Sequence, residues 1–202
     1  MISLESIMQI PKSDLEEASK NLNKDDLSEL IKWLSLKEDD LRYQAFLLLQ
    51  KRSIFSSDLY PYWDLFREKL KSDNSYQRSI GLMLIAENAR WDVDNKIEYT
   101  LDEFLLSLKD KKPITVRQCI QSLGKIALAK PETCGKITTS LIGFDLMAVR
   151  ETMRKPILLD IIDVLVIARK EAMGDAIEDF ILEALSGQVL DRKSKKLVEG
   201  LL

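Results

Sequence analysis

An arginine recurs at nearly constant intervals near the start of apolar stretches. The stretches are LRYQAFLL, QRSIGLML, VRQCIQSL and MRKPILLD, with a weaker copy, DRKSKKLV. Their arginines are Arg42, Arg78, Arg117, Arg154 and Arg192. The successive intervals are 36, 39, 37 and 38 residues. A period this regular is typical of a chain built from repeated helical units.

A second set of amphipathic stretches alternates with these segments. In the last of them, DAIEDFILEAL from Asp175, the apolar residues follow the spacing of one helix face. Each period is therefore predicted to be a helix A, a short turn and a helix B. The predicted boundaries are about 24–57, 58–92, 93–130, 131–171 and 172–202, after a capping segment at 1–23.

Composition supports an all-α fold. The chain has only seven glycines and five prolines, too few for a sheet protein with many hairpins. Its 46% apolar content excludes disorder, and the net charge of −3 does not suggest a strongly basic nucleic-acid binder. Because histidine is absent, Ser-His-Asp, Cys-His and HExxH sites are excluded.

The helix pairs resemble HEAT repeats. The resemblance rests on an Asp in the turn followed by an Arg-x-x-small/apolar run, as in Asp39 with Arg42 and Ala45, and in Asp73 with Arg78 and Gly81. Asp110 with Arg117 and Ile120 repeats it. The period is slightly shorter than the roughly 40–47 residues of such units. The resemblance implies a right-handed α-α superhelix, or solenoid, of about five HEAT-like helix pairs, in which B helices line the concave face and each Arg pairs with a turn Asp.

The fourth repeat has two possible registers. VRETM at Val149 competes with MRKPI at Met153, and Pro156 falls inside the predicted helix, where a kink is expected. The B helix is predicted to be long, about Leu146–Lys170.

Both ends resemble caps, which a helical array needs because its end repeats have no neighbour. SDLE at Ser13–Glu16 fits a capping box for a helix to about Leu22. At the other end, an inward apolar stripe is predicted at Leu190, Leu197, Val198 and Leu201. Leu201-Leu202 leaves open a small apolar contact with another chain, so a monomer or weak homodimer is expected.

The B helices carry the predicted binding surface. Between Asp110 and Lys130, five cations face one acid, which would make the concave face mildly basic, or would merely solvate it. The candidate binding residues are Gln44, Lys51, Gln77, Arg78, Arg117, Gln118, Gln121, Lys125 and Arg154. Val116, Ile120, Leu123 and Ala127 are predicted to face the core.

Other features have two interpretations each. Asp160 and Asp163 suggest a solvated strip rather than an acid/base or cation site. The aromatics at Tyr60, Tyr62 and Trp63 suggest packing rather than base stacking. Cys119 and Cys134 are expected to be buried and reduced. No catalytic residue, metal ligand or cofactor is predicted.

The favoured function is a non-enzymatic, cytoplasmic scaffold that docks another protein along the B helices. The alternative is a DNA-binding protein resembling HEAT-like alkylpurine DNA glycosylases, which use a basic concave groove. A third possibility is a bilin lyase or a related chaperone. No segment is long and apolar enough to cross a membrane, which takes about 20 residues.

Overall fold

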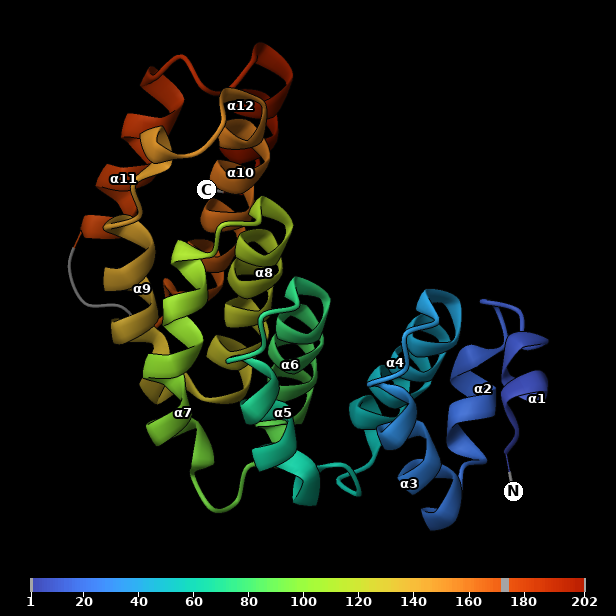
Figure 1. Ribbon diagram of the computed structural model, residues 1–202. Helices are drawn as coiled ribbons and strands as arrows, with labels where there is room; N and C mark the ends of the chain where they lie inside the picture. The colour runs from blue at the N-terminus through green and yellow to red at the C-terminus, as the bar shows by residue number, and fades with distance from the viewer. Residues whose placement is uncertain (1, 172–174, 202) are drawn as a thin grey trace. The chain divides into compact units, whose positions relative to one another are not determined.

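The computed structural model describes residues 2–171 and 175–201 and confirms an all-α fold. In this part of the chain there are twelve α-helices and five short 3-10 helices, with no strand. Figure 1 shows helices following one another from end to end of the chain. No helix among them is long and apolar enough to cross a membrane.

The helices form two compact units, Met1–Asn95 and Lys96–Leu202. The division falls at Asn95, whose φ of 54° is in the left-handed region. Asn is one of the few residue types with a side chain that adopt this conformation without large strain. Each unit has its own buried apolar core.

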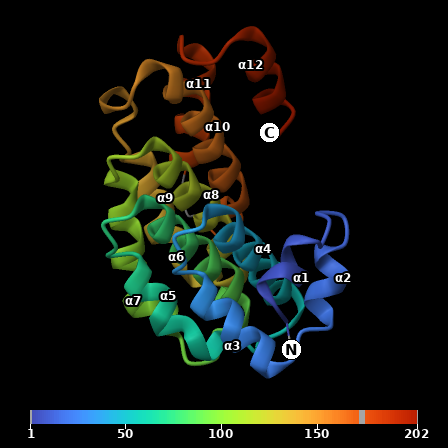
Figure 2. The ribbon, with the colours of Figure 1, turned by 45° about the vertical axis from the view of Figure 1, so that its right-hand side comes forward.

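In the first unit, α4 is the central helix. The α-helices are α1 (Leu4–Met8), α2 (Leu15–Lys20), α3 (Lys24–Trp33), α4 (Asp39–Phe55), α5 (Trp63–Lys69) and α6 (Ser75–Asn88). Helix α4 packs against α1, α2, α3 and α6, and α5 packs against α6. Figure 2 shows α1 and α2 beside α4.

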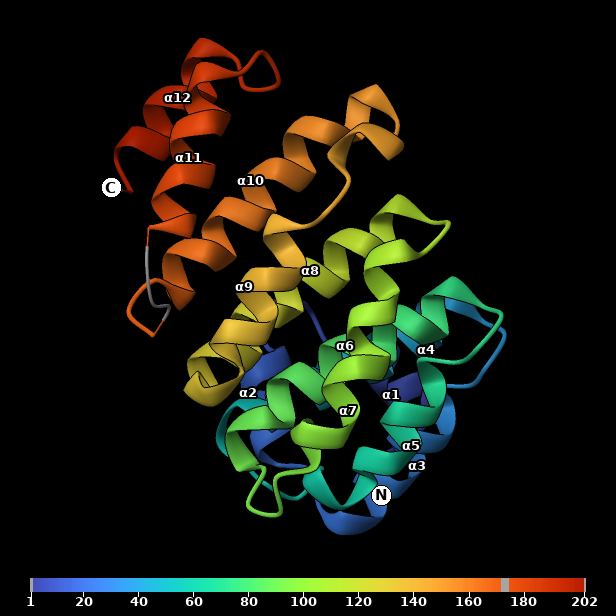
Figure 3. The ribbon, with the colours of Figure 1, turned by 90° about the vertical axis from the view of Figure 1, so that its left-hand side faces the viewer.

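In the second unit, α10 takes the central position. The α-helices are α7 (Lys96–Leu105), α8 (Pro113–Ala129), α9 (Cys134–Ile142), α10 (Glu151–Ala168), α11 (Ala176–Ser186) and α12 (Arg192–Glu199). Helix α10 packs against α8, α9, α11 and α12, and α11 also packs against α12 (Figure 3).

Each of the five predicted ranges contains one pair of these helices, from α3 and α4 to α11 and α12. Second helices of successive pairs pack together within each unit, as in α4 with α6 and α8 with α10. The predicted start of the fifth range, at 172, lies outside the described residues, as does the predicted contact at Leu202.

The predicted core residues are buried. On α8 these are Val116, Ile120, Leu123 and Ala127. Around α5, Leu59, Trp63, Phe66 and Leu70 are buried as well, so Trp63 packs in the core as predicted. Cys119 and Cys134 are free and buried, which confirms that prediction.

Gly81 lets α6 approach α5 closely. A Cβ built at this position would lie 2.6 Å from the backbone oxygen of Phe66 and 3.1 Å from Cβ of Lys69. Only glycine fits there without a shift of backbone. The small residue three positions after Arg78 in the repeated pattern therefore has a packing role.

The predicted capping box at the start of α2 is wrong. The helix begins at Leu15 after Asp14, whose side chain makes no cap hydrogen bond. The Ser13 hydroxyl instead donates to Oδ1 of Asp14 at 2.7 Å. The helix ends at Lys20, although Leu22 is still buried.

The fourth B helix is shorter than predicted. Leu146–Ala148 forms a separate 3-10 turn, capped by Asp145, whose side chain accepts from the backbone N–H groups of Met147 and Ala148. Helix α10 begins at Glu151 and continues through Pro156. The register is thus the one in which Arg154 is the fourth helical residue.

The predicted inward stripe at the C-terminal end is only half correct. Leu190 and Val198 are buried, but Leu197 is 61% exposed and Leu201 is 43% exposed. Ser194 and Val198, four residues apart, form the buried side of α12. Because adjacent helical residues point about 100° apart, Leu197 turns away from the core.

Candidate functional site: a basic cleft in the first unit

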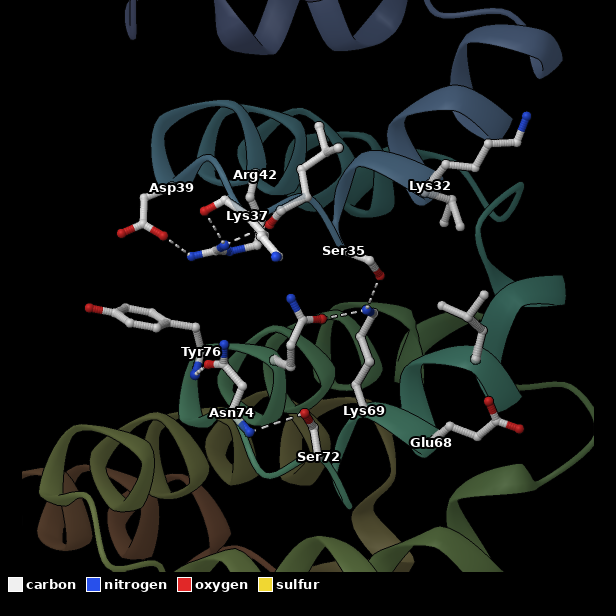
Figure 4. Close-up of a pocket in the computed structure, with 14 residues that line it drawn as sticks. Lys32, Ser35, Lys37, Asp39, Arg42, Glu68, Lys69, Ser72, Asn74 and Tyr76 are labelled. Carbon is white, nitrogen blue, oxygen red and sulfur yellow. Dashed lines mark hydrogen bonds and ion pairs between the residues drawn. The ribbon is translucent and has the colours of Figure 1, made fainter.

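A cleft of about 710 Å³ lies between the α3–α4 pair and the α5–α6 pair. Its upper wall in Figure 4 comes from α3, the following turn and the start of α4, and its lower wall comes from α5 and α6. Four cations reach it, namely Lys32, Lys37, Arg42 and Lys69, against two acids, Asp39 and Glu68.

The turn at the rim of the cleft is held by Arg42. This buried arginine, the fourth residue of α4, donates from Nη1 to the carbonyl oxygens of Leu36 at 2.7 Å and Lys37 at 3.4 Å. It also pairs with Asp39, and its guanidinium lies 5.5 Å from the ring centroid of Tyr76. The arginine thus fixes the turn that leads into its own helix.

The same arrangement recurs in other helix pairs. Arg78, the fourth residue of α6, donates to the carbonyl oxygens of Ser72 at 2.7 Å and Asp73 at 3.0 Å. Arg154, the fourth residue of α10, donates to those of Val149 at 3.2 Å and Met147 at 3.1 Å. Three of the five recurrent arginines, Arg42, Arg78 and Arg154, therefore connect linker to helix.

Lys69 is the distinctive cation of the cleft. Its ammonium donates to Oε1 of Gln77 at 2.5 Å and to the hydroxyl of Ser35 at 3.3 Å. Gln77 is itself oriented, because its Nε2 donates to the carbonyl oxygen of Leu34 at 2.7 Å. Figure 4 shows the Lys69 ammonium between the two helix pairs, next to Ser35.

The surroundings of Lys69 disfavour its positive charge. Burial lowers the pKa of the ammonium, and the positive charge of Arg42 lowers it further. Among the described residues no carboxylate forms an ion pair with Lys69, whereas Arg42 has Asp39 and Lys32 has Glu29. A ligand that brought a negative charge beside Lys69 would relieve this cost.

Of the nine residues predicted to form a binding surface, Gln77 lines this cleft. The other predicted binding residues of the first unit lie elsewhere. Gln44 donates to the carbonyl oxygens of Ile7 at 3.0 Å and Ile10 at 2.9 Å, so it holds the segment after α1. Lys51 is half-buried on α4, and Arg78 holds the linker before α6.

In the second unit, Arg117 and Gln121 converge on Asp160. Arg117 donates to both carboxylate oxygens, at 2.6 and 3.1 Å, and Gln121 donates to Oδ1 at 3.0 Å. Gln118 is half-buried and Lys125 is exposed on the same helix. The predicted residues therefore do not gather in a single site.

The two aspartates of α10 differ in exposure. Asp163 is exposed, as the predicted solvated strip requires, but Asp160 is buried and hydrogen-bonded, so that prediction is wrong for Asp160. Burial raises the pKa of Asp163, and the nearby Asp160 adds to the effect. Within the described ranges, no three acidic or cysteine side chains come together in a way that could hold a metal ion.

Lys69, Ser35 and Tyr76 were not predicted from the sequence as site residues. One signal was available, because Lys69 lies between the buried core residues Phe66 and Leu70. A lysine beside a helix's apolar stripe extends its methylene stem along neighbouring apolar groups and keeps its ammonium at the edge. Its position next to a second helix pair could not be read from the sequence.

Comparison with protein-family models gave no match, and comparison with curated proteins gave none either.

Proposed function

We propose that this chain is a non-enzymatic interaction scaffold of HEAT-like helix pairs, and that the cleft of the first unit docks an acidic segment of a partner protein. The observation that carries the proposal is Lys69, a partly buried cation that is held in place by neutral groups and faces a second cation, Arg42. In the proposed scaffold the pairs continue as a right-handed superhelix.

The packing of helices supports the scaffold part of the proposal. Pairs succeed one another along the chain, and second helices pack on second helices within each unit. Arg42, Arg78 and Arg154 each donate to carbonyl oxygens of the linker before their helix. Arrays of such units present extended surfaces, which serve mainly to hold other macromolecules.

The cleft suits a carboxylate for an energetic reason. Part of the cost of removing the Lys69 ammonium from water is already met in the free protein, where burial lowers its pKa, and Gln77 and Ser35 restrict its position. A glutamate or aspartate side chain would add a charge-assisted hydrogen bond to a preorganised donor. Ile31, Leu65 and Tyr76 provide apolar surface for the neighbouring residues of a peptide.

Peptide binding, measured by fluorescence anisotropy, tests the proposal. The probes are labelled glutamate-rich peptides and the same peptides with Gln for Glu. We expect the glutamate peptides to bind the wild type, and Lys69→Met to weaken binding at least about tenfold, which corresponds to a charge-assisted hydrogen bond. Lys24→Met, at an exposed position outside the cleft, removes the same charge and should leave binding unchanged.

Equal losses in the two variants, or equal binding of Glu and Gln peptides, would contradict the proposal. Duplex DNA in the same assay tests the alternative of a glycosylase-like protein. Tight DNA binding that falls steeply with salt and requires Lys69 would favour that alternative, because phosphate contacts release counterions.

A further inference from the structure

We propose that copies of this chain associate with one another through two unlike surfaces. One, the acidic patch, comprises Leu4, Glu5, Met8, Glu38, Asp40 and Leu41. The other, the basic face, comprises Arg192, Lys193, Lys196, Leu197 and Leu201. The inference goes beyond docking of a partner at the Lys69 cleft, because none of these residues lines that cleft, and only Asp39, beside the acidic patch, borders both.

The acidic patch surrounds a shallow hollow of about 570 Å³ beside α1. Leu4 and Met8, one helical turn apart, are 38% and 46% exposed, while Ile7 of the same helix is buried. In the described part of the chain, Glu5, Glu38 and Asp40 form no ion pair. The patch thus offers apolar surface with uncompensated negative charge at its edge.

Local structure explains why these groups come together. Helix α1 is held by a capping box between Ser3 and Ser6, which sets the direction of its exposed side. Glu38 and Asp40 lie at the start of α4, where the helix dipole favours carboxylates. Asp39, between them, pairs with Arg42 and lines both this hollow and the Lys69 cleft.

The basic face has the complementary composition. Lys193, Leu197 and Leu201 follow one another at four-residue intervals along α12 and its end, and Lys196 lies next to Leu197. The opposite side of the helix, with Ser194 and Val198, is buried. The start of α12 is fixed by Asp191, which caps the N–H of Ser194 at 2.8 Å and pairs with Lys155 at 2.8 Å.

The cations of this face outnumber the one nearby carboxylate, Glu199, which lines a pocket with Arg192 and Lys196. Arg192, Lys193 and Lys196 are exposed, and within residues 2–171 and 175–201 they form no ion pair. Exposed leucines surrounded by cations on one surface match exposed Leu4 and Met8 surrounded by carboxylates on the other. Apolar groups would supply the contact area, and the opposite charges would select the partner and set the register.

Each copy carries one acidic patch and one basic face, so the contact joins unlike surfaces of two copies. Because the charged groups are solvent-exposed, each pair adds little affinity, and association is expected to be weak and to decrease with salt.

Sedimentation velocity of the full chain tests the proposal. We expect the average mass of the wild type to rise with concentration at low salt and to fall back towards the monomer at high salt. Lys193→Glu with Lys196→Glu, and separately Glu38→Lys with Asp40→Lys, should each give a monomer. An equimolar mixture of the two variants should associate again, because one retains the native basic face and the other the native acidic patch.

Two further variants complete the design. Lys109→Glu with Lys111→Glu reverses the same amount of charge at exposed positions outside both surfaces and should associate like the wild type. Leu197→Ser tests the apolar part of the contact without a change of charge and should weaken association. A wild type that stays monomeric, or charge-reversed variants whose mixture stays monomeric although both melt cooperatively, would overturn the proposal.

Discussion

Arg117 of α8 and Asp160 of α10 form a bidentate ion pair. Nε of the arginine donates to Oδ2 at 2.6 Å and Nη2 donates to Oδ1 at 3.1 Å, while Gln121 shares Oδ1. The hydrogen bonds that Asp160 accepts raise the pKa of Arg117, and this effect outweighs the lowering of the pKa by burial. Asp160 is buried and receives three donors, so the pair joins the second helices of two successive helix pairs.

Removal of Arg117 should destabilise the second unit. Arg117→Ala leaves the buried Asp160 without its charged partner, and we expect a loss of about 1.5–3 kcal/mol in the free energy of unfolding. Denaturant unfolding of the single variants and the double variant Arg117→Ala/Asp160→Ala gives the coupling energy. Arg117→Met with Asp160→Leu should lie within about 1 kcal/mol of the wild type, since an apolar pair avoids a buried unpaired charge. A coupling energy near zero would show that the pair is not stabilising.

A methyl group at Gly81 should disturb the first unit. In Gly81→Ala the new Cβ meets the Phe66 oxygen at 2.6 Å, so α5 and α6 must separate, at a cost of about 1–3 kcal/mol. Gly135→Ala is the matched control, because nothing lies within 4 Å of the added Cβ. The control should be neutral or gain up to about 1 kcal/mol from helix propensity. Thermal unfolding of both variants shows whether the close approach of α5 and α6 contributes to stability.

Lys69→Met should raise stability at neutral pH while it weakens peptide binding. The folded state lowers the pKa of Lys69, so the charged lysine opposes folding whenever it is protonated in both states. As the pH rises through the folded-state pKa, the folded chain binds fewer protons than the unfolded chain, and wild-type stability increases relative to the variant. Melting temperatures of the two proteins should therefore converge towards pH 10. A difference between the two melting temperatures that widens as the pH rises would contradict this prediction.

Both thiols should resist labelling in the folded protein. Burial raises the pKa of Cys119 and of Cys134, so neither offers an exposed thiolate. We expect reaction with a disulfide reagent to be slow in buffer and complete in denaturant. Mass spectrometry of peptides identifies which thiol has reacted. Fast labelling of Cys134 alone would reveal local opening around α9 that leaves Cys119 covered.

Helix positions and apolar faces could be predicted from the sequence because they depend on local spacing. The stripe through Val116 and Ile120 follows from the spacing of one helix face. The pair of helices in each range and the small residue at Gly81 follow from repetition every 36–39 residues. The resemblance to HEAT repeats implied that each Arg pairs with a turn Asp. Arg42 pairs with Asp39 in the first turn of α4, whereas Arg117 pairs with Asp160 of α10 rather than with Asp110.

Partners across the fold could not be predicted in the same way. Arg117 pairs with an aspartate 43 positions later, in the middle of a helix, because packing of α8 on α10 decides which groups meet. The same holds for Lys69, whose oxygen partners come from Ser35 and Gln77. Leu197 was assigned to the core because two adjacent apolar residues leave the buried side ambiguous.

The arginines at the fourth helical position bear on how the chain is synthesised. Arg42 and Arg78 bind carbonyl oxygens five and six residues earlier, so each linker is completed by a residue that leaves the ribosome after it. A nascent chain that stops just before either arginine has the linker but not the side chain that sets its direction. The linkers before α4 and α6 can therefore acquire their geometry one after the other as translation proceeds.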